Sequence, residues 1–248
     1  MDMVEIGVLD NKVQLLQPKE GFRTSIDSVL LAAVCPARAG QRVLDMGCGV
    51  GGSGLCLLYR VPEAHLTGVD VQEICVETAV ENAARNGFAD RADFVLCSIL
   101  DFEVDSPDAR FDHVICNPPF MEAGEHMVSP VAHKAISNGH LDDDISIQDW
   151  VKSALRLLKS KGSLTMIHRA DAVDRIIRAM GKSFGQIEII PLWPKQGVDA
   201  KRVIVRAVKD RKTPAVIRAG LVLHREDGSY TDAAQAVFRG AKGLFDEI

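Results

Sequence analysis

The chain has 248 residues, a length at which one α/β domain is common, and its composition of 47% hydrophobic and 25% charged residues excludes a disordered, collagen-like or low-complexity protein. The net charge of −5 argues against indiscriminate nucleic-acid binding. No apolar run approaches the length of a membrane span, and the N-terminus lacks the layout of a secretory signal. We therefore expect a cytoplasmic protein without a membrane partner.

The first 41 residues are expected to form an extension to the main domain. Residues 4–16 predict a short hairpin that turns at Asp10 and Asn11. Residues 25–35 predict a helix with Ser25 as its N-cap. The six cysteines are scattered with no C-x-x-C spacing, and the histidines match no helical metal pair, so we expect free thiols and no metal.

From about residue 40, apolar strands alternate with helical patterns. The predicted strands cover residues 42–46, 65–70, 92–97, 111–117, 163–168, 186–192 and 201–209, and the predicted helices 51–60, 72–86, 146–158 and 171–182. This alternation indicates a mostly parallel sheet with helices on both faces. The last two strands follow each other without a helix, so one of them should run antiparallel. Residues 219–248 are expected to add a small piece to the same sheet, within a single domain of residues 1–248.

A glycine-rich turn follows the first of these strands. Gly47, Gly49 and Gly52 open a helix, which lets a ligand approach the backbone closely. The next strand ends in Asp70, where a carboxylate can accept hydrogen bonds from ribose hydroxyls. This spacing also satisfies the dinucleotide fingerprint, so an NAD-dependent oxidoreductase stays open. Asp45 favours another cofactor, because its charge repels a pyrophosphate but attracts the ammonium group of S-adenosylmethionine (SAM).

The tetrapeptide Asn117-Pro118-Pro119-Phe120 ends the fourth strand, at the sheet edge where ligands of open α/β folds bind. The Asn117 side-chain oxygen and the Pro118 carbonyl can each accept an N–H of a planar amino group, which aims the nitrogen lone pair at a methyl donor. The prolines restrict φ, and Phe120 offers a face on which a flipped base can stack.

These features resemble the class I SAM-dependent methyltransferases, in the amino-methylating branch marked by a (D/N/S)-P-P-(Y/F) tetrapeptide. The resemblance implies a Rossmann-like seven-stranded sheet with an antiparallel terminal strand pair, SAM as cofactor, and methyl transfer to an exocyclic amino nitrogen. It assigns catalysis to Asn117, Pro118 and Phe120.

The same resemblance assigns the cofactor site. Thr24 and Asp27 match an upstream motif that encloses the methionine end of SAM. The family often has an acid at the end of the third strand, where this chain has Ser98 instead, with Asp101 three residues on. The cofactor-binding set is Thr24, Asp27, Asp45, Gly47, Gly49, Asp70, Val71, Ser98, Ile99 and Asn117.

Charge is distributed unevenly along the chain. Residues 195–218 hold eight basic residues against two acidic ones, whereas residues 98–150 hold eleven acidic residues against two basic ones. A basic stretch on the terminal strand pair can follow RNA phosphates. We expect Lys209, Arg211 and Lys212 to contact the substrate backbone, with Pro119 and Phe120 at the base.

The closing segments, residues 201–209 and 221–231, and the upstream residues 22–31 resemble bacterial tRNA adenine-N6-methyltransferases that modify the purine beside the anticodon of a valine tRNA. That resemblance implies tRNA or another structured RNA as partner. Two alternatives within the class are a protein glutamine N5-methyltransferase, whose helical N-terminal domain finds little room here, and an rRNA guanine-N2 methyltransferase. Outside the catalytic class, a non-catalytic SAM-binding module also stays open.

Overall fold

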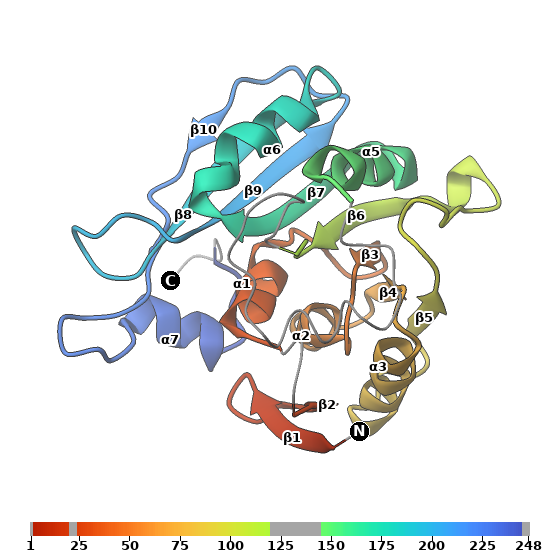
Figure 1. Ribbon diagram of the computed structural model, residues 1–248, viewed down its shortest axis with the longest axis horizontal. Coiled ribbons are helices and arrows are strands. Elements are labelled where there is room, and N and C mark those ends of the chain that lie inside the picture. Colours follow the sequence, from red (N-terminus) through yellow and green to blue (C-terminus); the bar gives the residue numbers. More distant parts are fainter. Residues whose placement is uncertain (1, 20–23, 120–144, 245–248) are drawn as a thin grey trace.

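The computed structural model describes residues 2–19, 24–119 and 145–244. Its main sheet contains seven longer strands: β3 (Arg42–Met46), β4 (His65–Asp70), β5 (Ala92–Leu96), β6 (Phe111–Cys116), β7 (Leu158–Arg169), β8 (Phe184–Trp193) and β9 (Arg202–Lys209). The two-residue strands β10 (Val216–Ile217) and β11 (Leu221–Val222) both pair with β8. The strand order is β10-β8-β9-β7-β6-β3-β4-β5 (Figure 1).

One strand of the sheet is reversed. The neighbours from β5 to β7 are parallel, whereas β9 lies between β7 and β8 and is antiparallel to both. The expected fold class and its antiparallel terminal pair are therefore confirmed, and β9 is the strand that turns back. The sheet has nine strands rather than seven, because β10 and β11 each add two residues alongside β8.

The parallel strands define two edges of the sheet. We call the edge where β3, β4 and β6 end the carboxyl edge, and the edge where they begin the amino edge. Because β9 is reversed, Arg202 at its start pairs with Arg169 at the end of β7, so it lies at the carboxyl edge. Lys209 at the end of β9 pairs with Phe184 at the start of β8, so it lies at the amino edge.

Helices cover both faces of the sheet (Figure 1). One face carries α1 (Ile26–Val34), α2 (Gly52–Arg60), α3 (Glu73–Arg85) and α7 (Asp232–Phe238), and the other carries α5 (Ile147–Leu157) and α6 (Val173–Met180). Short 3-10 turns lie at η1 (Pro107–Ala109) and η3 (Ala170–Ala172). Successive strand residues point to opposite faces, so Val43 joins the α1–α2 core and Leu44 the α5–α6 core. Helix α7 was not predicted.

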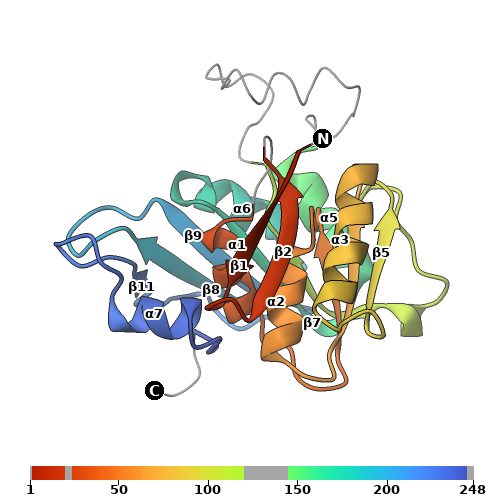
Figure 2. The ribbon, with the colours of Figure 1, turned by 90° about the horizontal axis from the view of Figure 1, so that it is seen from below.

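The N-terminal hairpin forms as expected, from β1 (Met3–Val8) and β2 (Val13–Pro18). Its turn takes positive φ at Leu9, Asp10 and Asn11. The hairpin packs on α2 and α3 rather than joining the main sheet (Figure 2). Ser25 caps α1 by accepting a hydrogen bond from the backbone N–H of Asp27 at 3.2 Å.

All six cysteines are free, and five of them are buried. Burial raises the pKa of Cys35 to about 11 and that of Cys56 to about 12, so both thiols stay protonated at neutral pH. Within the three described ranges, no group of three or more His, Cys, Asp or Glu side chains is placed to hold a metal ion. No helix in that part of the chain is long and apolar enough to cross a lipid bilayer.

Candidate cofactor and catalytic site

The strand register brings three predicted site residues together. Met46 pairs with Val69 on one side and with Cys116 on the other. The residues that follow these three positions, Gly47, Asp70 and Asn117, therefore lie side by side at the carboxyl edge. The backbone N–H of Cys97 donates to the Asp70 carbonyl at 3.0 Å, which places the end of β5 next along the same edge.

The glycine-rich loop needs glycine for two different reasons. Both Gly47 and Gly49 take positive φ, which L-residues rarely adopt. A Cβ at Gly47 would lie 2.7 Å from the ring of Trp150, so packing within the protein already requires glycine there. A Cβ at Gly49 would meet nothing within 4 Å. The open space beside Gly49 leaves its backbone accessible to a ligand.

Asp70 holds the loop from the end of β4. Its Oδ2 accepts the N–H of Gly49 at 2.8 Å, and its Oδ1 accepts the N–H of Gln72 at 3.0 Å. The side chain is 8% exposed, and burial raises its pKa. A carboxylate has about four lone-pair sites, so it can accept further hydrogen bonds. Val71, the next residue, is half-buried.

Asp45 lies beneath the loop and is 2% exposed. Its Oδ2 accepts the N–H of Gly54 at 3.1 Å, in the first turn of α2, where the helix dipole favours an anion. Burial nevertheless raises the pKa of Asp45 to about 7, and the nearby charge of Asp70 adds to this shift. The structure thus gives Asp45 an internal partner that the sequence did not indicate.

Asn117 carries an acceptor that the described residues leave unused. Its Oδ1 is buried and has no hydrogen-bond partner among the described residues. A buried acceptor without a partner is uncommon, and a ligand N–H would satisfy it. Pro118 is buried and Pro119 is exposed, whereas the predicted Phe120 lies outside the described residues.

Thr24 and Asp27 approach the loop from the N-terminal side. A Cβ at Gly52 would lie 2.7 Å from the Thr24 hydroxyl, so Thr24 packs on the first residue of α2. Asp27 is buried and accepts a hydrogen bond from Nε of Arg202 at 3.2 Å. The sequence missed Arg202 because it left open which of the last two strands is reversed.

Ser98 and Ile99 differ in what they can offer a ligand. Ser98 is half-buried, and its Oγ accepts the N–H of Leu100 at 3.3 Å, so it turns the chain after β5. Ile99 is buried in the α5–α6 core. The structure therefore argues against a side-chain contact between Ile99 and the cofactor, because the residue faces the core instead.

A model of the methyltransferase small domain matches residues 23–192. The chain belongs to this family. It is a SAM-dependent methyltransferase, which overturns the oxidoreductase alternative that the glycine spacing had left open.

Two curated relatives carry the name tRNA1(Val) (adenine(37)-N6)-methyltransferase. The protein from Vibrio campbellii is 34% identical over 218 residues, which cover 88% of this chain and 87% of the relative. The protein from Bacteroides thetaiotaomicron is 28% identical over 192 residues, or 75% of this chain and 77% of the relative. A crystal structure from Agrobacterium tumefaciens, described as a predicted O-methyltransferase, matches with a TM-score of 0.71 and 25% identity over 88% of this chain and 97% of that chain.

The basic residues predicted to contact RNA lie at the amino edge of this methyltransferase. Lys209 is engaged within the protein, since its Nζ donates to the carbonyls of Leu155 at 2.9 Å and Leu158 at 2.8 Å. Partial burial also lowers the pKa of Lys209. Two of the three N–H donors of the Lys209 ammonium group thus bind the C-terminal end of α5, which argues against the predicted phosphate contact.

Other members of the basic stretch are also used internally. Arg206 and Arg218 both form ion pairs with the buried Glu188. By contrast, Arg211 and Lys212 are exposed, and together with Lys182 they line a groove of about 340 Å³. No ion pair or side-chain hydrogen bond involves these three cations within the described part of the chain.

Proposed function

We propose that this methyltransferase transfers the methyl group of SAM to the exocyclic N6 of an adenine in tRNA. The observation that carries the proposal is the buried Oδ1 of Asn117 beside the glycine-rich loop, which no described residue hydrogen-bonds. The names of the relatives support adenine 37 of a valine tRNA as the target nucleotide. A tRNA substrate also supports action in the cytoplasm.

The residues at the carboxyl edge fit SAM. The open backbone at Gly49 leaves room for a ligand, and Asp70 keeps acceptor capacity for ribose hydroxyls. Asp45 supplies negative charge below the loop for the amino-acid part, while Thr24, Asp27, Val71 and Ser98 surround the same edge. When bound, SAM supplies an electrophilic methyl group on a sulfonium.

Asn117 and Pro118 act on the nucleophile. The lone pair of an adenine amino group is delocalised into the ring, which makes the nitrogen a poor nucleophile. Two acceptors, Oδ1 of Asn117 and the carbonyl oxygen of Pro118, hold its two N–H groups and favour a tetrahedral nitrogen with its lone pair directed outward. Pro119 is exposed beside these acceptors, and Phe120, which lies outside the described residues, stays a sequence-based prediction for base stacking.

Arg211 and Lys212, joined by Lys182, contact RNA phosphates away from the methylated base. The strand β8 spans ten residues between the two edges, or about 30 Å at about 3.3 Å per residue. A folded RNA is long enough to reach both edges.

The chain forms one domain in this proposal. The packing of the β1–β2 hairpin on α3, and of α7 on α1, supports a single domain of residues 1–248.

Nucleoside mass spectrometry tests the proposal. Purified enzyme and isotope-labelled SAM are incubated with total tRNA from a strain that lacks the gene, and the Asn117→Ala variant is the control. We expect label in N6-methyladenosine, and in the anticodon-loop fragment of one valine tRNA after nuclease mapping. Parallel reactions offer rRNA and a release factor, and label in N2-methylguanosine of the rRNA or in glutamine of the release factor would replace the proposal.

A further inference from the structure

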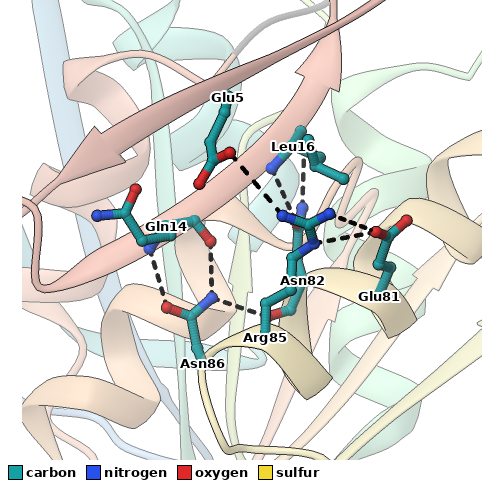
Figure 3. Close-up of polar contacts among 7 residues, drawn as sticks. All are labelled: Glu5, Gln14, Leu16, Glu81, Asn82, Arg85 and Asn86. Atoms are coloured by element: carbon teal, nitrogen blue, oxygen red, sulfur yellow. Dashed lines mark hydrogen bonds and ion pairs between the residues drawn. The ribbon is translucent and has the colours of Figure 1, made fainter.

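Two asparagine side chains, Asn82 of α3 and Asn86 at its C-cap, pair with the outer edge of β2 (Figure 3). Asn82 accepts the N–H of Leu16 at 2.7 Å and donates to the Leu16 carbonyl at 2.9 Å. Asn86 accepts the N–H of Gln14 at 2.9 Å and donates to the Gln14 carbonyl at 2.7 Å. Each side chain thus makes the same two hydrogen bonds with a β2 residue.

This pairing works because a primary amide carries the same donor and acceptor as a peptide group. Asn82 and Asn86 are one helical turn apart, a rise of about 6 Å, and Gln14 and Leu16 are two strand residues apart, about 6.8 Å. The other edge of β2 pairs with β1. Helix α3 therefore takes the place of a neighbouring strand and holds the hairpin on the domain.

The two asparagines differ in their third hydrogen bond. Asn82, which is 0% exposed, also donates from Nδ2 to the carbonyl of Val50 at 2.9 Å. Val50 lies between Gly49 and Gly51 in the glycine-rich loop. The third bond of Asn86 returns to the carbonyl of Asn82 at 2.7 Å and stays within the C-terminal end of α3 and its cap. Of this matched pair, only Asn82 contacts both the hairpin and the loop.

Other contacts between hairpin and helix are weaker or indirect. Arg85 reaches Glu5 of β1 at 3.9 Å and Glu81 at 2.8 Å, but all three side chains are exposed, so these ion pairs contribute little (Figure 3). A second route runs through Gln17, whose Oε1 accepts the N–H of Thr24 at 2.9 Å. The first route joins β2 through Asn82 to Val50, just before α2 begins, and the second joins β2 through Gln17 to Thr24, which packs on Gly52 at the start of α2.

We propose that Asn82 is a positioning residue that couples docking of the β1–β2 hairpin to the shape of the glycine-rich loop. Ordering the loop around SAM then tightens the hairpin, and a docked hairpin favours SAM, since coupling between two sites is reciprocal. A buried amide is tolerated because the hydrogen bonds to Leu16 and Val50 satisfy it. Asn82 acts through the loop and is not itself a ligand contact.

Calorimetric titration with SAM separates this role from a purely structural one. We expect Asn82→Ala to weaken SAM binding by about fivefold or more, the lower end of typical coupling. Asn86→Ala removes a matching pair of hairpin bonds without touching the loop, so it should stay within about twofold of the parent. Both variants should lower thermal stability. Equal SAM affinities for the two variants would overturn the proposal.

Two further measurements test the coupling without relying on Asn82→Ala. Asn82→Asp keeps the volume and the acceptor but removes the donors for the Leu16 and Val50 carbonyls, so it should weaken SAM binding as much as Asn82→Ala. Hydrogen exchange tests the parent protein directly. SAM should slow exchange of the Leu16 and Gln14 amides in the parent. In Asn86→Ala, where the Gln14 amide has lost its acceptor, SAM should still slow exchange of the Leu16 amide. If SAM leaves hairpin exchange unchanged in the parent, the coupling does not exist.

Discussion

The two edges of the sheet are built differently. At the carboxyl edge, Asp45 and Asp70 are buried and accept hydrogen bonds from backbone N–H groups, and Asn117 has a buried acceptor that no residue of the described ranges uses. At the amino edge, Arg211 and Lys212 are exposed beside an open groove. A fixed, desolvated edge suits the positioning of reacting groups, whereas an exposed basic edge suits contacts with a solvated polyanion. Chemistry and long-range RNA contacts can therefore be disrupted separately.

The largest effect is expected at the carboxyl edge from Asn117→Ala. The hydrogen bond to the amino group strengthens as the nitrogen becomes tetrahedral, so its loss should cost on the order of 3 to 4 kcal/mol in the transition state. That corresponds to about 10²- to 10³-fold in rate. Single-turnover methylation of tRNA at saturating SAM measures it, normalised to folded enzyme.

SAM and RNA affinities should change little in Asn117→Ala, because the acceptor contributes mainly in the transition state. A strand-end role alone would instead lower stability by about 1 kcal/mol and leave turnover unchanged. A single-turnover rate within about threefold of the parent would therefore remove Asn117 from the catalytic set.

Asp70→Ala should affect the same edge through SAM binding. The variant removes the proposed acceptor for ribose hydroxyls and also releases the N–H of Gly49. Charge-assisted hydrogen bonds contribute roughly 1.5 to 3 kcal/mol, so SAM affinity should fall by about 10- to 150-fold. Calorimetry measures this, and the circular dichroism spectrum of the variant should match the parent. Unchanged affinity would show that Asp70 only shapes the turn.

Much of the carboxyl edge was predictable because parallel strands end together. The predicted bounds of β3 and β4 match the structure, and this register alone brings Gly47 and Asp70 side by side. The edge reached by β9 was not predictable, since the sequence showed only that one of the last two strands is antiparallel. Lys209 was assigned to RNA because it belongs to the basic stretch of residues 195–218, and the sequence did not show that its ammonium group reaches the end of α5.

Residues that act through tertiary packing were also missed. Trp150 requires glycine at position 47, although the two lie about a hundred residues apart in the chain. Asn82 looks like an ordinary polar residue of an amphipathic helix, and only the docked hairpin shows that it is buried. A local sequence pattern carries no information on which distant backbone a helix face meets.

At the amino edge, combined Lys182→Gln, Arg211→Gln and Lys212→Gln should weaken RNA binding and its salt dependence. Each lost phosphate contact removes about 0.7 to 0.9 from the log–log slope, so three should remove about 2 to 2.7. SAM affinity should not change. A short anticodon stem-loop that occupies only the carboxyl edge should bind the parent and the variant equally.

Lys209→Gln is the matched control for that variant. Its ammonium group binds the carbonyls of Leu155 and Leu158, so the substitution should lower thermal stability and leave the salt slope of RNA binding unchanged. If the salt slope of RNA binding falls in Lys209→Gln and stays unaltered in the triple variant, then Lys209 contacts phosphate and Lys182, Arg211 and Lys212 do not.

The smallest effect is expected in the pH dependence that Asp45 imposes on the carboxyl edge. Burial raises the pKa of Asp45 from 3.8 to about 7. Between these two pH values the folded protein keeps a proton on Asp45 that the unfolded chain has released. This contribution to stability is complete below pH 3.8 and is lost as the pH rises through about 7. Asp45→Asn keeps an acceptor for the Gly54 N–H and should remove that loss.

A bound ammonium group favours the ionised form of Asp45, so SAM binding below pH 7 should release a proton from this carboxyl group. We expect parent SAM affinity to rise about tenfold between pH 6 and pH 7.5, whereas Asp45→Asn should show only the titration of the ligand itself. Calorimetry in two buffers of different ionisation enthalpy counts the proton directly. If parent and variant release the same number of protons at pH 6, Asp45 does not face the charge of the cofactor, and its carboxylate serves only the first turn of α2.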